Sequence, residues 1–403
     1  MPVLRGAPVS QQPVLRFGLI GLGGGGRSLL RAFREHPAIR LTAAADVRPE
    51  ALDEFSREYG ADTFLSAEEL CRSPNVDAVW VATPNHLHAE HAIIAAEHHK
   101  HVIVSKPMAV TIDECQEMIA ACEKHGVRLL VGHTQSLLPG IRKMAELVRS
   151  GSFGRLGMVH SWHFTPWIYR PRMPEELDLA KGGGVVYRQA PHQIDIVRFI
   201  GGGQVRSVRA MTGMWDAARP VPGAFVTYLE FQDGTPATIV YSGYGHFDAS
   251  ELTFGLGGFL SGRGRVLVPS GLPAAAEEML KQSERDTASA TNKPQSPASG
   301  TKDVPSVPFG LTIASCARAD LRQSPSGITV YGHQGQRREI PVPGPEPRGW
   351  PELQDLYDAV MYGKPIVHDG HWGLATQEVV TAIMRSAEER REVFLAHQAA
   401  VAI

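Results

Sequence analysis

The chain has 403 residues, enough for about two domains. Hydrophobic residues make up 43% and charged residues 20%, the balance of a globular protein, and the formal net charge of -2 gives no electrostatic reason to expect nucleic acid or an anionic membrane as a partner. Residues 1–15 form an expected N-terminal extension without the apolar core of a signal peptide. No stretch reaches the length of about 18 apolar residues that a membrane span needs, so we expect a cytoplasmic protein.

A glycine-rich segment near the start carries the most informative motif. Residues 17–20 are apolar and predict a buried strand. Gly21, Gly23 and Gly26 follow at the spacing G-x-G-x-x-G. In that motif the first glycine allows a tight turn, the second lets a pyrophosphate approach the backbone, and the third lets the next helix pack closely. The free N–H groups at the start of that helix would bind the phosphates. A run of glycines could also be a plain flexible loop.

Asp46 strengthens the nucleotide-binding interpretation. It ends a second apolar strand, 20 residues after Gly26, where a carboxylate accepts hydrogen bonds from the ribose hydroxyls of NAD. Its charge would repel the 2′-phosphate of NADP, whereas Arg48 could attract one, so we expect NAD and leave NADP open. The residues expected to bind the cofactor are Gly21, Leu22, Gly23, Gly25, Gly26, Asp46, Arg48, Thr83, Asn85, His88, Ser105 and Lys106.

Strand and helix signals alternate up to residue 148, which predicts a doubly wound parallel sheet. We assign residues 16–148 to a Rossmann dinucleotide-binding domain, whose ligands bind at the carboxyl ends of the strands. The later predicted strands cover residues 61–64, 76–82, 101–104 and 127–131. The predicted helices cover residues 49–59, 86–98 and 111–124, and one more begins at Ser66. The candidate residues at strand ends are Gly21, Asp46, Thr83, Lys106 and His133.

The pattern changes near residue 150, and we assign residues 149–403 to a substrate-binding and oligomerisation domain of the α+β class. Residues 271–308 are rich in small and polar residues and predict a long mobile insertion. Strand-like alternation without regular helices predicts a mostly antiparallel sheet from residues 158–164, 205–212, 225–231, 238–244 and 327–331. Closing helices are predicted over residues 351–362 and 374–394.

Cysteine and histidine spacing gives no case for a metal. The four cysteines show no ligand spacing and are expected to be buried, reduced thiols. Six histidines lie between residues 86 and 101, but no cysteine or acidic ligand set accompanies them. We therefore expect no metal site.

Two segments carry candidate chemistry. Lys106, in Ser105-Lys106-Pro107 at a predicted strand end, could polarise a hydroxyl or carbonyl oxygen. Arg188 and His192 lie four residues apart in a predicted helix and so share a face, where the histidine can accept a proton and the arginine can bind a carboxylate. On residue types alone, a structural histidine and a surface arginine are the more common interpretation. A cluster upstream could line a pocket for a planar anion or form an interface: Trp162, Trp167, Tyr169, Arg170 and Arg172.

With these motifs the chain resembles the Gfo/Idh/MocA family, the glucose–fructose oxidoreductase and inositol dehydrogenase group. The glycine motif and residues 82–88, 104–108, 182–195 and 369–386 carry the resemblance, which covers most of the chain. It implies a Rossmann domain followed by an α+β domain with a large, mostly antiparallel open-faced sheet, through which members form homodimers or homotetramers. It also implies NAD(P)-dependent oxidation of a hydroxyl group, with Lys106 and His192 as the catalytic pair.

This chain departs from the family pattern at two positions. The usual Glu-Lys-Pro is Ser105-Lys106-Pro107, and the aspartate usual four residues before the histidine is Arg188. An arginine there argues for an anionic substrate, and residues 185–192 resemble the branch that oxidises the cis-4,5-dihydrodiol of phthalate to 4,5-dihydroxyphthalate. The residues expected to bind this small, anionic, aromatic-derived substrate are His133, Trp167, Tyr169, Arg170 and Arg188, with Arg172 as an alternative to Arg170 for a second carboxylate.

Two other functions stay open at this point. One is a sugar or polyol dehydrogenase of the same family, acting on inositol-like substrates. The other is a non-catalytic sensor that binds a dinucleotide without turnover.

Overall fold

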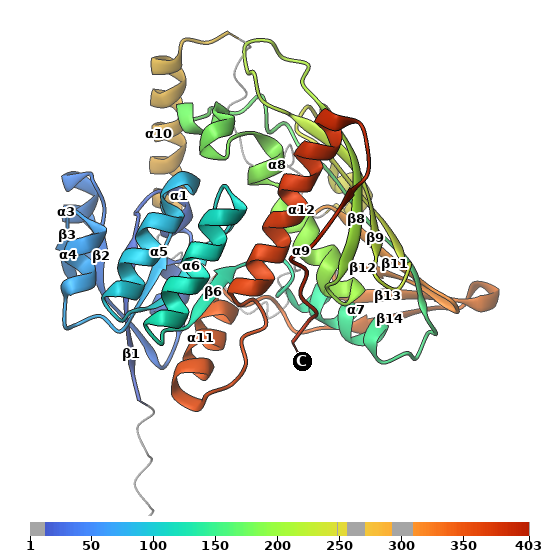
Figure 1. The fold of residues 1–403 in the computed structure, drawn as a ribbon, viewed down its shortest axis with the longest axis horizontal. Coiled ribbons are helices and arrows are strands. Elements are labelled where there is room, and N and C mark those ends of the chain that lie inside the picture. The colour runs from blue at the N-terminus through green and yellow to red at the C-terminus, as the bar shows by residue number, and fades with distance from the viewer. Residues whose placement is uncertain (1–12, 248, 256–270, 292–308, 403) are drawn as a thin grey trace, which may run out of the picture.

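The structure is a computed structural model that describes residues 13–247, 249–255, 271–291 and 309–402, with the backbone alone at 284–291. Most of the expected N-terminal extension lies outside these residues. Two sheets lie side by side, with helix α12 (Gly370–Glu389) between them (Figure 1). Within the described residues, no helix is both long enough and apolar enough to cross a membrane.

The first sheet has six parallel strands in the order β3-β2-β1-β4-β5-β6. This is the strand order of the dinucleotide-binding fold, so the predicted doubly wound sheet is confirmed. Its strands are β1 (Leu15–Ile20), β2 (Ile39–Ala45), β3 (Asp62–Phe64), β4 (Ala78–Val81), β5 (His101–Ser105) and β6 (Leu129–Gly132).

Helices cover both faces of this sheet, because its central strands are apolar on both sides. Val79 and Val81 pack into one core with one helix layer, and Phe17 and Trp80 pack into a second core on the opposite face. The helices of this half are α1 (Gly24–Arg27), α2 (Leu30–Glu35), α3 (Pro49–Tyr59), α4 (Ala67–Arg72), α5 (His88–Glu97) and α6 (Ile112–Lys124), with a 3₁₀ turn at Asn85–Leu87.

The end of the chain returns to the first sheet. Helix α11 (Trp350–Tyr362) lies below the first sheet, near β6 (Figure 1). Its Leu353 and Leu356 pack in the same core as Trp80. Helix α12 contacts both α6 of the first half and β8 (Val205–Gly213) of the second. Two helices from the second predicted domain thus complete the packing of the Rossmann half.

The second sheet has nine strands in the order β14-β13-β12-β11-β7-β10-β9-β8-β15. All neighbouring pairs are antiparallel except β7 with β10, so the predicted mostly antiparallel sheet is confirmed. Helices α7 (Pro139–Arg149), α9 (Ala190–Gly201) and α12 cover one face of this sheet. The remaining strands are β7 (Leu156–Phe164), β9 (Ala224–Phe231), β10 (Pro236–Ser242), β11 (Leu311–Cys316), β12 (Ala319–Gln323), β13 (Gly327–Gly332), β14 (Arg337–Pro341) and β15 (Val393–Phe394).

The opposite face of this sheet is open. Apolar side chains on it that remain exposed are Met158, Trp162, Met211, Val226 and Tyr228.

Three local predictions differ from the structure. The expected mobile insertion contains helix α10 (Ala274–Thr291), while residues 292–308 lie outside the described residues. The expected helix over 374–394 begins earlier and ends at Glu389, where β15 follows after a turn. The predicted helix that would hold both Arg188 and His192 is two helices: α8 (Gly184–Arg188) ends at Arg188, and α9 (Ala190–Gly201) holds His192.

Pro191 explains the break between α8 and α9. A proline lacks an N–H donor and its ring clashes with the preceding turn, so it is tolerated at the start of a helix and not inside one. Pro191 accordingly lies in the first turn of α9, directly after the break at Gln189. Arg188 and His192 therefore do not share one helical face, contrary to the sequence-based expectation.

Candidate active site

The glycine motif has the geometry that a dinucleotide requires. Gly21 has a φ of +99°, and a Cβ there would lie 2.8 Å from the Ala82 carbonyl oxygen. A Cβ on Gly26 would collide with the Gly21 carbonyl oxygen, whereas a Cβ on Gly23 would meet no atom within 4 Å among the described residues. Two of the glycines are thus required by the protein's own backbone, and the open space at Gly23 fits a pyrophosphate that approaches the main chain.

Asp46 follows β2 at the same edge of the sheet. Its Oδ2 accepts a hydrogen bond of 2.8 Å from the Leu22 N–H, and its Oδ1 accepts one of 3.0 Å from the Arg48 N–H. The Arg48 guanidinium also donates to both oxygens, at 2.9 and 3.0 Å. Burial would raise the pKa of Asp46, but Arg48 and these N–H groups hold it below its usual value. The carboxylate therefore stays ionised, and Arg48 offsets its charge.

Several other residues expected at the cofactor bond to the protein's own loops. The Asn85 side chain donates to Gly182 O at 2.9 Å, which ties the first half to the segment before α8. The two ring nitrogens of buried His88 lie 2.8 Å from Pro107 O and 3.0 Å from Thr83 O. These contacts position the loops at the carboxyl ends of β4 and β5.

Ser105, which replaces the usual glutamate, accepts a hydrogen bond of 3.1 Å from the Trp80 indole N–H. Leu22 is buried and Gly25 is exposed beside the open space at Gly23. Direct contact of Thr83, Asn85, His88, Ser105 and Gly25 with a cofactor stays a prediction.

Lys106 joins the two halves of the molecule. Its Nζ donates a hydrogen bond of 2.7 Å to Arg188 O at the end of α8. Burial lowers the pKa of Lys106 well below its ordinary value, and the positive charges of Arg188 and Arg348 lower it further. An ammonium group with a lowered pKa can exchange a proton nearer to neutral pH.

His192, on the first turn of α9, is only 6% exposed. Its ring lies 4.7 Å from the ring of Phe309, and its Nδ1 has no hydrogen-bond partner among the described residues. Burial lowers the pKa of His192 well below its ordinary value, with further lowering by the charges of Lys106 and Arg348. His192 is therefore neutral at neutral pH, the state in which it can accept a proton.

Arg188 forms an ion pair with a buried carboxylate that other cations also contact. Its Nε lies 3.4 Å from Oε1 of buried Glu176. The same carboxylate contacts Arg172 Nη1 at 3.1 Å through Oε1 and Lys281 Nζ of α10 at 3.7 Å through Oε2. Burial would raise the pKa of Glu176, but these three cations hold it well below its usual range.

A second carboxylate belongs to the same cluster. Glu277 of α10 lies 2.9 Å from Arg219 and accepts from the Arg172 N–H at 2.6 Å. In these ion pairs four cationic side chains meet two carboxylates. The residues are Arg172, Arg188, Arg219 and Lys281, with Glu176 and Glu277.

The aromatic and basic cluster before α8 is partly internal structure. The Arg172 guanidinium lies 3.7 Å from the centre of the buried Trp167 ring and donates to Trp167 O and Glu176. These contacts occupy Arg172, so of the two arginines expected to bind substrate we retain Arg170 as the candidate. Tyr169 lines a pocket with Trp215, Tyr244 and His246, and neither Lys106 nor His192 is among the residues that line it.

His133 follows β6 and is 1% exposed, with its ring 5.8 Å from that of His368. Neither ring nitrogen of His133 has a partner among the described residues. Burial lowers the pKa of His133 to about 4, so it is neutral at neutral pH.

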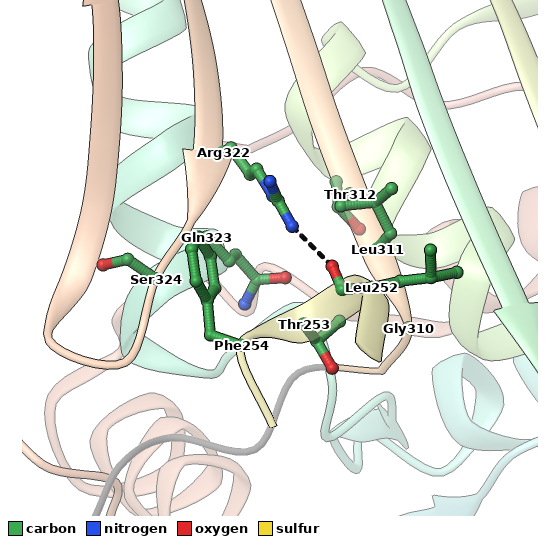
Figure 2. A pocket seen from close by; sticks show the side chains of 9 residues that line it. All are labelled: Leu252, Thr253, Phe254, Gly310, Leu311, Thr312, Arg322, Gln323 and Ser324. Atoms are coloured by element: carbon green, nitrogen blue, oxygen red, sulfur yellow. Dashed lines mark hydrogen bonds between the residues drawn. The ribbon is translucent and has the colours of Figure 1, made fainter. Parts of the chain in front are cut away.

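A separate small pocket lies at the end of the second sheet, between β11, β12 and the 3₁₀ turn Ala249–Thr253 (Figure 2). The Arg322 guanidinium crosses it to donate to Leu252 O (Figure 2). Neither Lys106 nor His192 lines this pocket, so we do not assign the chemistry to it.

Sequence reasoning missed two residues of the site. Glu176 and Arg348 lie outside the motifs, since one is in a 3₁₀ turn and the other in the loop before α11. Both residues contact segments that are distant in the sequence, so the spacing of residues along the chain gave no sign of their role.

Comparisons with known proteins agree with this architecture. Residues 15–133 match the oxidoreductase family with an NAD-binding Rossmann fold, and residues 141–255 match the GFO/IDH/MocA C-terminal domain. The chain is 33% identical to 1-carboxy-3-chloro-3,4-dihydroxycyclohexa-1,5-diene dehydrogenase of Comamonas testosteroni over 93% of this chain and 95% of that protein. It is 30% identical to myo-inositol 2-dehydrogenase of Thermotoga maritima, over 49% of this chain and 58% of that one.

A solved structure from Bordetella bronchiseptica RB50, assigned as a dehydrogenase, superposes with a TM-score of 0.83. It is 36% identical, and the match covers 95% of this chain and all of that one. The chain therefore belongs to the Gfo/Idh/MocA family of NAD-binding oxidoreductases.

Proposed function

We propose that this protein is an NAD-dependent dehydrogenase that oxidises a carboxylated cis-dihydrodiol of an aromatic ring. Phthalate 4,5-dihydrodiol, which would give 4,5-dihydroxyphthalate, is the expected substrate. The observation that carries the proposal is the gathering of cations at the site: the charges of Arg188 and Arg348 act on Lys106, and those of Lys106 and Arg348 act on His192. The full-length relative whose name specifies a carboxylated diene diol supports the same substrate class.

The proposed chemistry uses the two residues that the fold brings together. NAD⁺, held by the glycine turn and Asp46, would supply the acceptor for the hydride that leaves the carbinol carbon. One N–H of the Lys106 ammonium donates to Arg188 O, and the remaining N–H groups would donate to the carbinol oxygen. Neutral His192 would take the hydroxyl proton. The ketone left behind would move a ring proton to oxygen and become a catechol, and aromatisation favours the products.

Substrate carboxylates would be held by arginines, because a guanidinium binds a carboxylate through two parallel hydrogen bonds. Arg188 is partly exposed, its side chain 26% accessible, so it could bind substrate while keeping its contact with Glu176. We propose Arg188 and Arg170 for one carboxylate, and His133, Trp167 and Tyr169 as walls of the site.

The test is NADH formation with a panel of carboxylated cis-dihydrodiols, neutral cis-dihydrodiols, inositol and hexoses. His192→Asn should lower kcat by about 10²–10⁴-fold, as expected for loss of a general base, with little change in the Kd for NAD. His371→Asn, which changes an exposed histidine on α12, is the matched control.

Each competing function has its own outcome in this panel. Turnover of inositol or hexoses alone would favour a polyol dehydrogenase, and NAD binding without any turnover would favour a sensor. Normal turnover in His192→Asn would remove the histidine from the mechanism. Tighter binding of NADP than of NAD would contradict the expected role of Asp46.

A further inference from the structure

Arg348 lies in the loop before α11, which packs tightly against the first sheet. The next residue, Gly349, has a φ of +89°, and a Cβ there would lie 2.8 Å from Leu29 and 3.1 Å from the Trp80 ring. Trp80 in turn donates its indole N–H to Ser105, the residue before Lys106. The loop therefore holds the Arg348 backbone at the edge of the sheet where Lys106 lies.

Arg348 differs from the other arginines of the site because no carboxylate among the described residues forms an ion pair with it. Arg172, Arg188 and Arg219 each form an ion pair with a carboxylate. Arg348 is exposed, and within the described part of the chain its guanidinium has no ion pair or hydrogen bond.

The nearest acidic group offers little compensation. Glu352, in the first turn of α11, is fully buried, and neither of its carboxyl oxygens has a hydrogen-bond partner among the described residues. Burial raises the pKa of Glu352 to about 7, so much of it is protonated at neutral pH. Its attraction for Arg348 is correspondingly weak.

Lys106 and His192 both lie within the field of Arg348, which lowers the pKa of each. The Arg348 guanidinium therefore lies close enough to both residues of the proposed proton-transfer pair for its charge to act on them. A cation in that position matches an anion carried by the substrate close to its reacting carbon.

We propose that Arg348 binds the substrate carboxylate nearest the reacting carbinol carbon and so selects carboxylated diols over neutral ones. This deepens the proposed function and rests on it. Arg188, which is already paired with Glu176, would bind the substrate carboxylate that lies farther from the reacting carbon. Binding of the substrate anion also offsets the positive charge beside His192, which makes this base stronger when a carboxylated substrate is in place.

The experiment compares Arg348→Gln and Arg348→Lys with Arg337→Gln, an exposed arginine on β14, as the control. Three quantities are measured: the Kd of the phthalate dianion as an unreactive probe, the Kd of NAD, and KM for a carboxylated and a neutral cis-dihydrodiol. Arg348→Gln should weaken phthalate binding by about 10–100-fold, the range for loss of a charged hydrogen-bonded pair. NAD binding and the KM of the neutral diol should stay close to those of the unmodified protein.

Arg348→Lys should give an intermediate loss, because lysine keeps the charge and lacks the planar fork. The acid limb of the kcat/KM profile should move to higher pH in Arg348→Gln and stay in place in Arg348→Lys. Equal losses for charged and neutral diols, weaker NAD binding, or unchanged phthalate binding would each overturn the proposal.

The two proposals fail in different ways. If the unmodified protein does not oxidise carboxylated diols but Arg348→Gln still weakens phthalate binding, the anion site stands and the proposed reaction falls. If carboxylated diols are oxidised equally well by Arg348→Gln, the reaction stands and the role of Arg348 falls.

Discussion

At the scale of single residues, the three motif glycines have different reasons for lacking a side chain. Gly21 and Gly26 are confined by the backbone around them, since an added Cβ would meet the Ala82 or Gly21 carbonyl. Gly23 faces open space. The first two should therefore matter for folding, and the third for binding a ligand in that space.

We expect Gly26→Ala to destabilise the protein by about 1–3 kcal/mol or more, as overpacking against a rigid backbone does. Gly23→Ala should keep the melting temperature but raise the Kd for NAD by about tenfold or more, because its methyl group would occupy the space expected for the pyrophosphate. Thermal unfolding and a fluorescence titration with NAD separate the two effects. Unchanged NAD binding in Gly23→Ala would argue against a pyrophosphate at this turn.

At the scale of elements, α10 is attached to the site through charge. Its Glu277 and the partner Arg219 are almost fully buried, at 7% and 3% side-chain exposure. A polar, alanine-rich segment such as this one carries little apolar surface of its own, so the helix depends on ion pairs that the rest of the fold supplies.

Glu277→Gln should therefore lower stability strongly, by about 3–5 kcal/mol, because it leaves a buried arginine without its carboxylate. Glu278→Gln, at the exposed neighbour, should change stability by no more than about 0.5 kcal/mol. Melting temperatures of the two variants, with hydrogen exchange over 274–283, provide the measurement. Equal melting temperatures would show that α10 does not depend on this pair.

At the scale of the whole molecule, buried neutral histidines from both halves contribute to the response to acid. Burial lowers the pKa of His88, His133 and His163 to about 4 each. The unfolded chain binds protons at these histidines near pH 6.5, before the folded chain does. Their contribution to stability is therefore complete above about pH 6.5 and is lost as the pH falls toward 4.

Stability should accordingly fall between pH 6.5 and 4, by up to about 1.4 kcal/mol per pH unit for each histidine. His163→Phe removes one of these groups, so its melting temperature should depend less steeply on pH in that range. Thermal unfolding of both proteins in matched buffers tests this. A flat profile for the unmodified protein across the window would contradict the assignment of these histidines as neutral.

The open face of the second sheet supports the proposed homodimer or homotetramer. Val226 is 58% exposed and lies opposite Met211 on β8 and Val240 on β10, so the apolar surface is continuous across three strands. We expect Val226→Glu with Tyr228→Glu to reduce the molar mass measured by light scattering. If the unmodified protein is already a monomer at working concentration, the proposed assembly through this face is wrong.

The sequence by itself determined the first half of the fold, because each glycine, strand end and acidic residue of the dinucleotide motif has a local physical reason. The lysine at the end of β5 could be placed at the ligand edge for the same reason. The antiparallel character of the second sheet followed from alternation along single strands, without knowledge of their neighbours.

Only the tertiary structure decided what depends on contacts between distant segments. The sequence of residues 351–362 predicts a helix but not that its apolar face packs on Trp80, since such a face could pack on many apolar surfaces. Pro191 lies in the sequence, yet the break that it causes became clear only with the two helices in place. The pairing of Arg188 with Glu176, and the unpaired charge of Arg348, arise from long-range proximity, which residue spacing does not encode.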